Sequence, residues 1–115
     1  QLVFKQVPAT EIAHAGLVIN AGSRDEAAQE WGLAHFFEHM LFKGTRKRKA
    51  YHVISRLDAV GGELNAYTTR ERTCLHASFR QVHAQRALEL LADIYFEASF
   101  PERELNRERE VVLEE

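Results

Sequence analysis

The segment His-Phe-Phe-Glu-His at residues 35–39 says more about this chain than any other part of its sequence. An α-helix turns by about 100° per residue, so residues four apart point the same way, about 40° and one turn apart. On a helix His35 and His39 therefore form a chelating pair. Glu38 lies about 60° from His35 and about 100° from His39. We expect Glu38 to flank a metal ion rather than to ligate it.

The surroundings of this segment make a metal ion the better explanation. The motif lies in an apolar run from Trp31 to Lys43, which predicts a buried helix that ends before Gly44. Two histidines and a glutamate buried there without partners would be costly, and a bound cation would satisfy all three together. The alternative is that three ordinary core side chains share one helix. We predict a zinc site with one open coordination position and a base beside it.

Two histidines are too few for such a site, and the third ligand must come from elsewhere in the chain. Isolated candidates, which are more often ordinary core or surface residues, are His14, His52, His76 and Cys74. Glu108 and Glu115 share one face of the last predicted helix, about 10.5 Å apart along its axis, so one could ligate the metal and the other support it. Spacing alone leaves that choice open, because this acidic helix could also present both to solvent.

The remaining patterns predict an α+β domain with the element order ββααββαα, an antiparallel sheet backed by helices. Strands are expected at residues 2–7, 12–20, 63–68 and 73–80, of which the last two form a hairpin. Helices are expected at residues 31–43, 50–60 and 84–99, and in the charged segment that begins at Pro101. We expect residues 1–115 to be a single domain that is truncated.

Composition argues against several other classes of protein. The chain has 115 residues, is 45% apolar and carries a net charge of −2, which suits one packed domain and gives no electrostatic reason for a nucleic-acid partner. The basic run Arg46–Lys49 lacks interleaved aromatic residues and is expected to be a solvated loop. No apolar run approaches the roughly 18 residues of a membrane span. We expect a soluble protein, and the compartment, bacterial cytoplasm or periplasm, stays open.

Residues 35–39 also match HxxEH, the inverted form of the HExxH zinc-peptidase motif. The segment His-Phe-Phe-Glu-His-Met-Leu-Phe-Lys-Gly-Thr at residues 35–45 resembles the active-site helix of the pitrilysin, insulin-degrading enzyme and mitochondrial processing peptidase family. Residues 61–71 resemble that family's edge-strand region, and residues 108–115 resemble its distal glutamate segment. The resemblance covers essentially the whole chain and implies the first part of a pitrilysin-like repeated domain.

This resemblance implies a role for each matching residue. Those that would hold one zinc ion per chain are His35, His39 and Glu115. Glu38 would be the general base that activates the zinc-bound water, and Glu108 the carboxylate that supports catalysis from behind the ligands. The residues beside which an extended peptide would add to the sheet edge are Asn65 and Ala66.

The function that the resemblance implies is that of a zinc-dependent metalloendopeptidase acting on peptides or unfolded polypeptides. Family members pair such a half with a second homologous half, or with a partner subunit, that closes the cleft over the substrate. We therefore expect the 115-residue chain alone to be inactive. The alternative is a non-catalytic peptide-binding or scaffold subunit of the same fold, which the intact motif disfavours.

Overall fold

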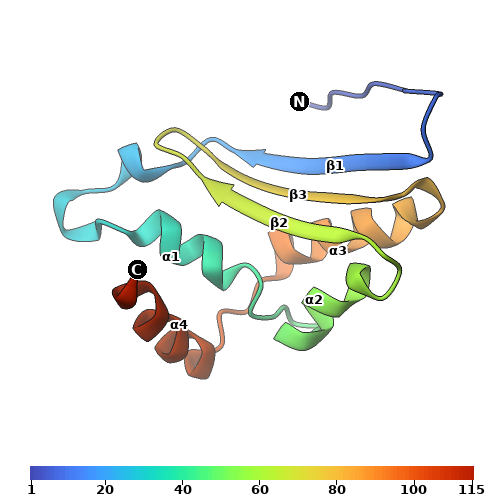
Figure 1. Cartoon of the computed structure of the whole chain (residues 1–115). Coiled ribbons are helices and arrows are strands. Elements are labelled where there is room, and N and C mark those ends of the chain that lie inside the picture. Colours follow the sequence, from blue (N-terminus) through green and yellow to red (C-terminus); the bar gives the residue numbers. More distant parts are fainter.

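A computed structural model describes all residues from 1 to 115 and confirms an α+β fold with an antiparallel sheet (Figure 1). The strands are β1 (Ile12–Ile19), β2 (Glu63–Thr68) and β3 (Thr73–Arg80). The α-helices are α1 (Leu33–Met40), α2 (Ala50–Asp58), α3 (Ala84–Glu97) and α4 (Glu102–Glu114). No helix is both long enough and apolar enough to cross a membrane.

The sheet has the order β1-β3-β2, so both β1 and β2 are edge strands. β2 and β3 form the predicted hairpin, in which Glu63 pairs with Ser78 and Thr68 with Thr73. Exposure alternates along β1 and β2, as expected for strands with one covered face, whereas most of β3 is buried. Because β2 is bonded to β3 on one side only, its outer edge is open to a further strand.

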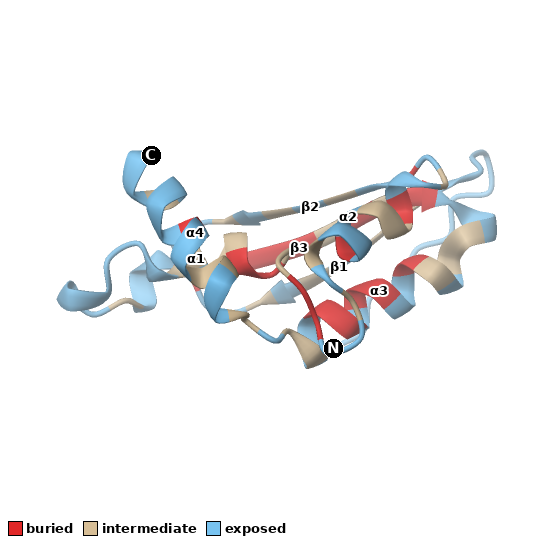
Figure 2. Ribbon diagram, turned by 90° about the horizontal axis from the view of Figure 1, so that it is seen from below, coloured by how far each residue is buried: buried red, intermediate tan, exposed pale blue.

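The helices lie on one side of the sheet, where α3 packs against β3 and α2 packs against α3 and β2 (Figure 1). The core residues come mainly from α2, α3 and β3. Figure 2 shows the buried residues gathered on these elements, whereas α4 is exposed over most of its length. The core cluster consists of Leu41, Val53, Leu57, Leu75, Ala77, Phe79, Ala87, Leu90, Leu91 and Ile94. The expected helices at 50–60 and 84–99 are present, each ending two residues early.

The strand expected at residues 2–7 is wrong. These residues lie outside any strand, and Leu2, Val3 and Phe4 are 94%, 80% and 83% exposed. β-propensity describes how a side chain fits a pleated, partly buried surface, and it does not supply a neighbouring strand. The observed order therefore has one opening strand, β1, in place of two.

The expectation of a buried helix at residues 31–43 is also wrong. α1 covers Leu33–Met40, and only Met40 in it is buried, whereas Trp31 before it is 81% exposed and Phe37 is 38% exposed. The physical reason is that α1 packs against α4, β2 and the short 3₁₀ turn at Ser23–Asp25, and these neighbours leave part of its surface open. An apolar composition all round a helix shows that it can be buried, but only the surrounding elements decide how much is.

Candidate metal centre

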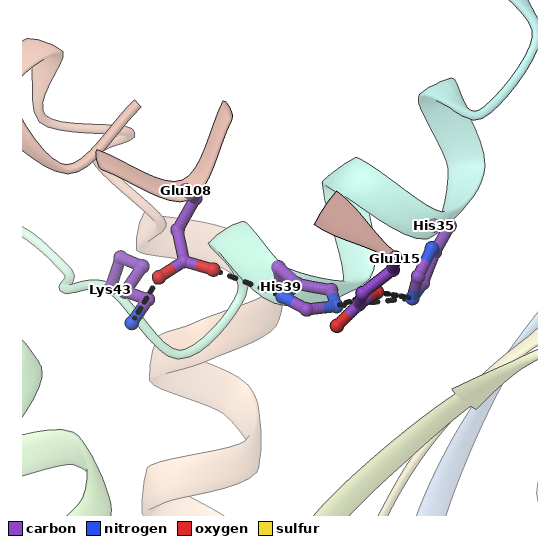
Figure 3. A network of polar contacts seen from close by, with 5 residues as sticks. All are labelled: His35, His39, Lys43, Glu108 and Glu115. Carbon is purple, nitrogen blue, oxygen red and sulfur yellow. Dashed lines mark hydrogen bonds and ion pairs between the residues drawn. The ribbon is translucent and has the colours of Figure 1, made fainter. Parts of the chain in front are cut away.

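The two histidines of α1 point to the same side of the helix, toward α4 (Figure 3). Their Nε2 atoms lie 3.0 Å apart, and the ring centroids lie 4.6 Å apart. The helical spacing of four residues is sufficient to explain this convergence. His39 is the more enclosed of the two, with 22% of its side chain exposed against 45% for His35.

Glu115, directly after α4, completes the cluster. Its Oε2 lies 3.2 Å from the Nε2 of His35 and 3.6 Å from the Nε2 of His39. The chain has one group of three or more His, Cys, Asp or Glu residues whose ligand atoms all lie within 4.8 Å of one another. This group consists of His35, His39 and Glu115. The isolated candidates, His14, His52, His76 and Cys74, do not belong to the cluster.

Glu108 occupies a different position, behind His39. Its Oε2 lies 2.9 Å from Nδ1 of His39, and its Oε1 lies 2.8 Å from Nζ of Lys43 (Figure 3). Burial opposes ionisation of the Glu108 carboxyl, but hydrogen bonds from Lys43 and His39 outweigh it and hold the pKa of Glu108 below its ordinary value. The two glutamates that spacing could not separate thus have different surroundings in the folded chain.

This position of Glu108 determines which nitrogen of His39 carries a proton. A carboxylate only accepts hydrogen bonds, so Nδ1 of His39 donates to it. In the neutral ring, Nε2 then keeps its lone pair and faces Nε2 of His35 and Oε2 of Glu115. Such orientation of a histidine by a carboxylate is typical of metal ligands.

The geometry and chemistry of the three converging atoms fit zinc. Zinc in a tetrahedral site has bonds of about 2.0–2.1 Å to nitrogen, which places neighbouring ligand atoms about 3.3 Å apart. The three atoms of His35, His39 and Glu115 are separated by 3.0, 3.2 and 3.6 Å. Two imidazoles and one carboxylate leave a fourth position for water or substrate, which is the composition of catalytic zinc sites.

Glu38 and the edge of the sheet share one cavity with His39. The cavity has a volume of about 440 Å³, and its lining residues are Glu38, His39, Phe42, Lys43, Ile54, Leu64, Asn65, Ala66 and Glu108. Glu38 does not belong to the group of converging ligand atoms, although it faces the same cavity as His39. Asn65 and Ala66 come from β2, so the open strand edge lies alongside α1.

Sequence reasoning assigned no site role to Lys43 or Arg48. Lys43 follows His39 by four residues, as His39 follows His35, and this repeated spacing is the signal that could have indicated the contact of Lys43 with Glu108. The expectation of a solvated loop at residues 46–49 is only partly confirmed. Its Arg48 is 19% exposed in the side chain and donates to Asp93, which lies on α3.

The two histidines of the HxxEH segment on α1, with Glu115 beside them, follow the pattern of the inverted-motif zinc peptidases. The family model described as "Insulinase (Peptidase family M16)" matches residues 1–115. This chain therefore belongs to the insulinase family, peptidase family M16.

Individual relatives agree with this assignment. The chain is 40% identical over its whole length to an uncharacterized zinc protease of Bacillus subtilis, YmxG, of which it covers 28%. Over 90% of its length it is 45% identical to a probable mitochondrial-processing peptidase subunit beta of Arabidopsis thaliana, of which it covers 19%.

Solved structures resemble the fold as well. A protease from Helicobacter pylori superimposes with a TM-score of 0.88 at 30% identity, over 91% of this chain and 25% of that one. The periplasmic protease PqqL from Escherichia coli gives a TM-score of 0.84 at 29% identity, over 92% of this chain and 12% of that one. The chain thus spans about a quarter or less of the proteins it resembles.

Proposed function

We propose that the full-length protein containing this chain is a zinc-dependent metalloendopeptidase that hydrolyses extended peptides. The observation that carries the proposal is the convergence of His35, His39 and Glu115 beside a cavity that also contains Glu38 and the open edge of β2. The zinc proteases among the relatives support it, and because the chain spans a small part of them, the activity is assigned to the full-length protein.

In this proposal His35, His39 and Glu115 hold one zinc ion, which supplies Lewis acidity toward water and the scissile carbonyl when bound. Glu38 accepts the proton of the attacking water at its carboxylate and passes it to the leaving amine. Glu108 keeps His39 in the tautomer that leaves Nε2 free of a proton.

The substrate binds in extended form along β2, beside Asn65 and Ala66. Backbone groups at the open edge of a sheet can pair with any extended peptide, so this mode is loose in sequence and strict in conformation. The apolar side chains of Phe42, Ile54 and Leu64 line the cavity and exclude water around the bound chain. A second homologous half or subunit supplies the groups that close the cleft and stabilise the developing oxyanion.

The experiment that tests this function is the substitution Glu38→Gln in the full-length protein. We expect stoichiometric zinc to be retained and cleavage of a quenched-fluorescent peptide library to be lost, because glutamine cannot accept the proton. Glu102→Gln, an exposed carboxylate on α4, is the matched control and keeps full activity. Loss of zinc from Glu38→Gln would show that Glu38 is a ligand. An unaltered protein that binds peptides but never cleaves them would instead indicate the non-catalytic subunit.

A further inference from the structure

The polar contacts behind His39 continue past Glu108 to Lys43, for which the motif itself gives no role (Figure 3). The side chain of Glu108 is only 6% exposed, so donors from the protein, rather than bulk water, satisfy its carboxylate. Each carboxylate oxygen has one such donor, at 2.8 Å from Lys43 and 2.9 Å from His39. The bond to Lys43 therefore selects the rotation of the carboxylate that leaves Oε2 directed at His39.

The backbone that carries Lys43 is held against the end of α3. Lys43 lies in the connection between α1 and α2, residues 41–49. In this connection the carbonyl of Gly44 accepts a hydrogen bond of 3.2 Å from the N–H of Ser99, and the N–H of Arg46 donates one of 3.0 Å to the carbonyl of Glu97. These two bonds lie on either side of Thr45, and they restrict the position of the neighbouring backbone that carries the Lys43 side chain.

A buried side-chain network fixes the same connection. Asp93 on α3, with a side chain that is 4% exposed, accepts through Oδ2 from the hydroxyl of Thr45 and from Nη1 of Arg48, both at 2.6 Å. Its Oδ1 is buried without a hydrogen-bond partner. With two donors on one oxygen of its buried carboxylate, Asp93 holds Thr45 and Arg48 in place.

We propose that Lys43, braced by the Asp93 network, is a positioning residue of the metal centre. Lys43 orients the Glu108 carboxylate, Glu108 holds His39 with its proton on Nδ1, and Nε2 of His39 is thereby presented to the metal. This inference rests on the proposed function, since it concerns the same zinc ligands. It extends that function by adding a charged residue and a buried anchor that are not themselves metal ligands.

The test compares five substitutions in the purified protein. Lys43→Met removes the donor, Lys43→Gln keeps a weaker neutral donor, and Lys43→Arg restores a charged one. Lys47→Met, the same change at an exposed position of the same connection, is the matched control. A fifth variant, Asp93→Asn, weakens the brace without touching the centre. Zinc affinity is measured by competition with a chelator. The tautomer of His39 is read from the ¹⁵N chemical shifts of its ring in the zinc-free protein. Urea unfolding shows whether each variant folds.

We expect Lys43→Met to weaken zinc binding by about tenfold, the low end of the range for residues that orient ligands. Its His39 ring should change from one tautomer to a mixture. Lys43→Gln should give an intermediate result, Lys43→Arg and Lys47→Met should match the unaltered protein, and Asp93→Asn should weaken binding several-fold. A merely structural lysine would change the urea midpoint but neither readout.

Two results would overturn the proposal. One is unchanged zinc affinity together with an unchanged His39 tautomer in Lys43→Met or, if that variant does not fold, in Lys43→Gln. The other is unaltered zinc affinity in Asp93→Asn, which would remove the bracing role. The tautomer comparison uses zinc-free protein, so failure of the unaltered protein to bind zinc would contradict the proposed function while leaving Lys43 testable.

Discussion

Exchanging the carboxylates of Glu115 and Glu108 for amides should separate a zinc ligand from the residue that supports it. Oε2 of Glu115 lies 3.2 and 3.6 Å from the two Nε2 atoms. Among the ring nitrogens of the two histidines, Glu108 contacts only Nδ1 of His39. In Glu115→Gln the charged ligand becomes a neutral and weaker one. In Glu108→Gln all three converging atoms remain in place.

The expected magnitudes follow from these positions. Structural zinc sites bind with apparent free energies of about 10–16 kcal/mol over four ligands, or roughly 2.5–4 kcal/mol for each. Loss of the Glu115 ligand should therefore weaken zinc binding by about 10²–10³-fold. Loss of the orienting carboxylate in Glu108→Gln should weaken it by about 10–100-fold.

The assay is competition between each zinc-free variant and a chromophoric chelator of known affinity at neutral pH. Glu114→Gln, the exposed neighbour of Glu115, is the control and should bind zinc as the unaltered protein does. Equal losses in Glu115→Gln and Glu108→Gln, or a larger loss in Glu108→Gln, would refute the assignment of Glu115 as the ligand. So would a loss in Glu114→Gln that equals the loss in Glu115→Gln, since the effect would then come from the charge of the helix end.

Three further predictions concern the substrate edge, acid stability and the chain alone. Ala66→Pro should raise KM sharply with zinc retained, because proline removes a backbone donor from the open edge of β2. His14→Pro on the opposite edge strand is the control and should leave KM unchanged; equal kinetics in the two variants would place the substrate elsewhere. The pKa of Glu108 is lowered in the folded chain, so the stability that this carboxylate contributes is present above its unfolded pKa of 4.5 and is lost as pH falls through its folded pKa. Urea midpoints measured from about pH 5 downward should therefore fall less steeply with pH in Glu108→Gln than in the unaltered protein, and identical slopes would contradict this linkage. The chain of 115 residues should cleave no peptide even with zinc added, since a missing oxyanion donor alone commonly costs about 10²–10³-fold in rate. If this chain alone does cleave peptides, and the Glu38→Gln variant of it does not, then no second half is needed.

The local patterns of the sequence were sufficient to predict several elements. The hairpin strands at 63–68 and 73–80 have the predicted bounds, because a short polar turn between two β-prone runs permits little else. The convergence of His35 and His39 also follows from the sequence, since a spacing of four residues on a helix sets their directions without help from the rest of the fold. Local geometry of this kind needs only the backbone dihedrals of one element.

Contacts between elements could not be derived in the same way. Residues 2–7 have strand-like composition but no neighbouring strand to pair with, and the apolar run around α1 gave no indication of which face would stay uncovered. Strand pairing and helix burial both depend on which other elements pack nearby. The residue pattern of one segment carries no information about its neighbours in the fold.

The division of roles between Glu108 and Glu115 shows where sequence reasoning ends and tertiary structure begins. Helical geometry places both on one face of α4, but only the packing of α4 against α1 decides which carboxylate meets the two Nε2 atoms and which lies behind His39. The contact of Lys43 with Glu108 depends on the same packing, across 65 positions of the chain. The sequence by itself determined the directions of side chains within each helix, whereas the distance between two helices, which sets every contact of the centre, is a property of the folded chain alone.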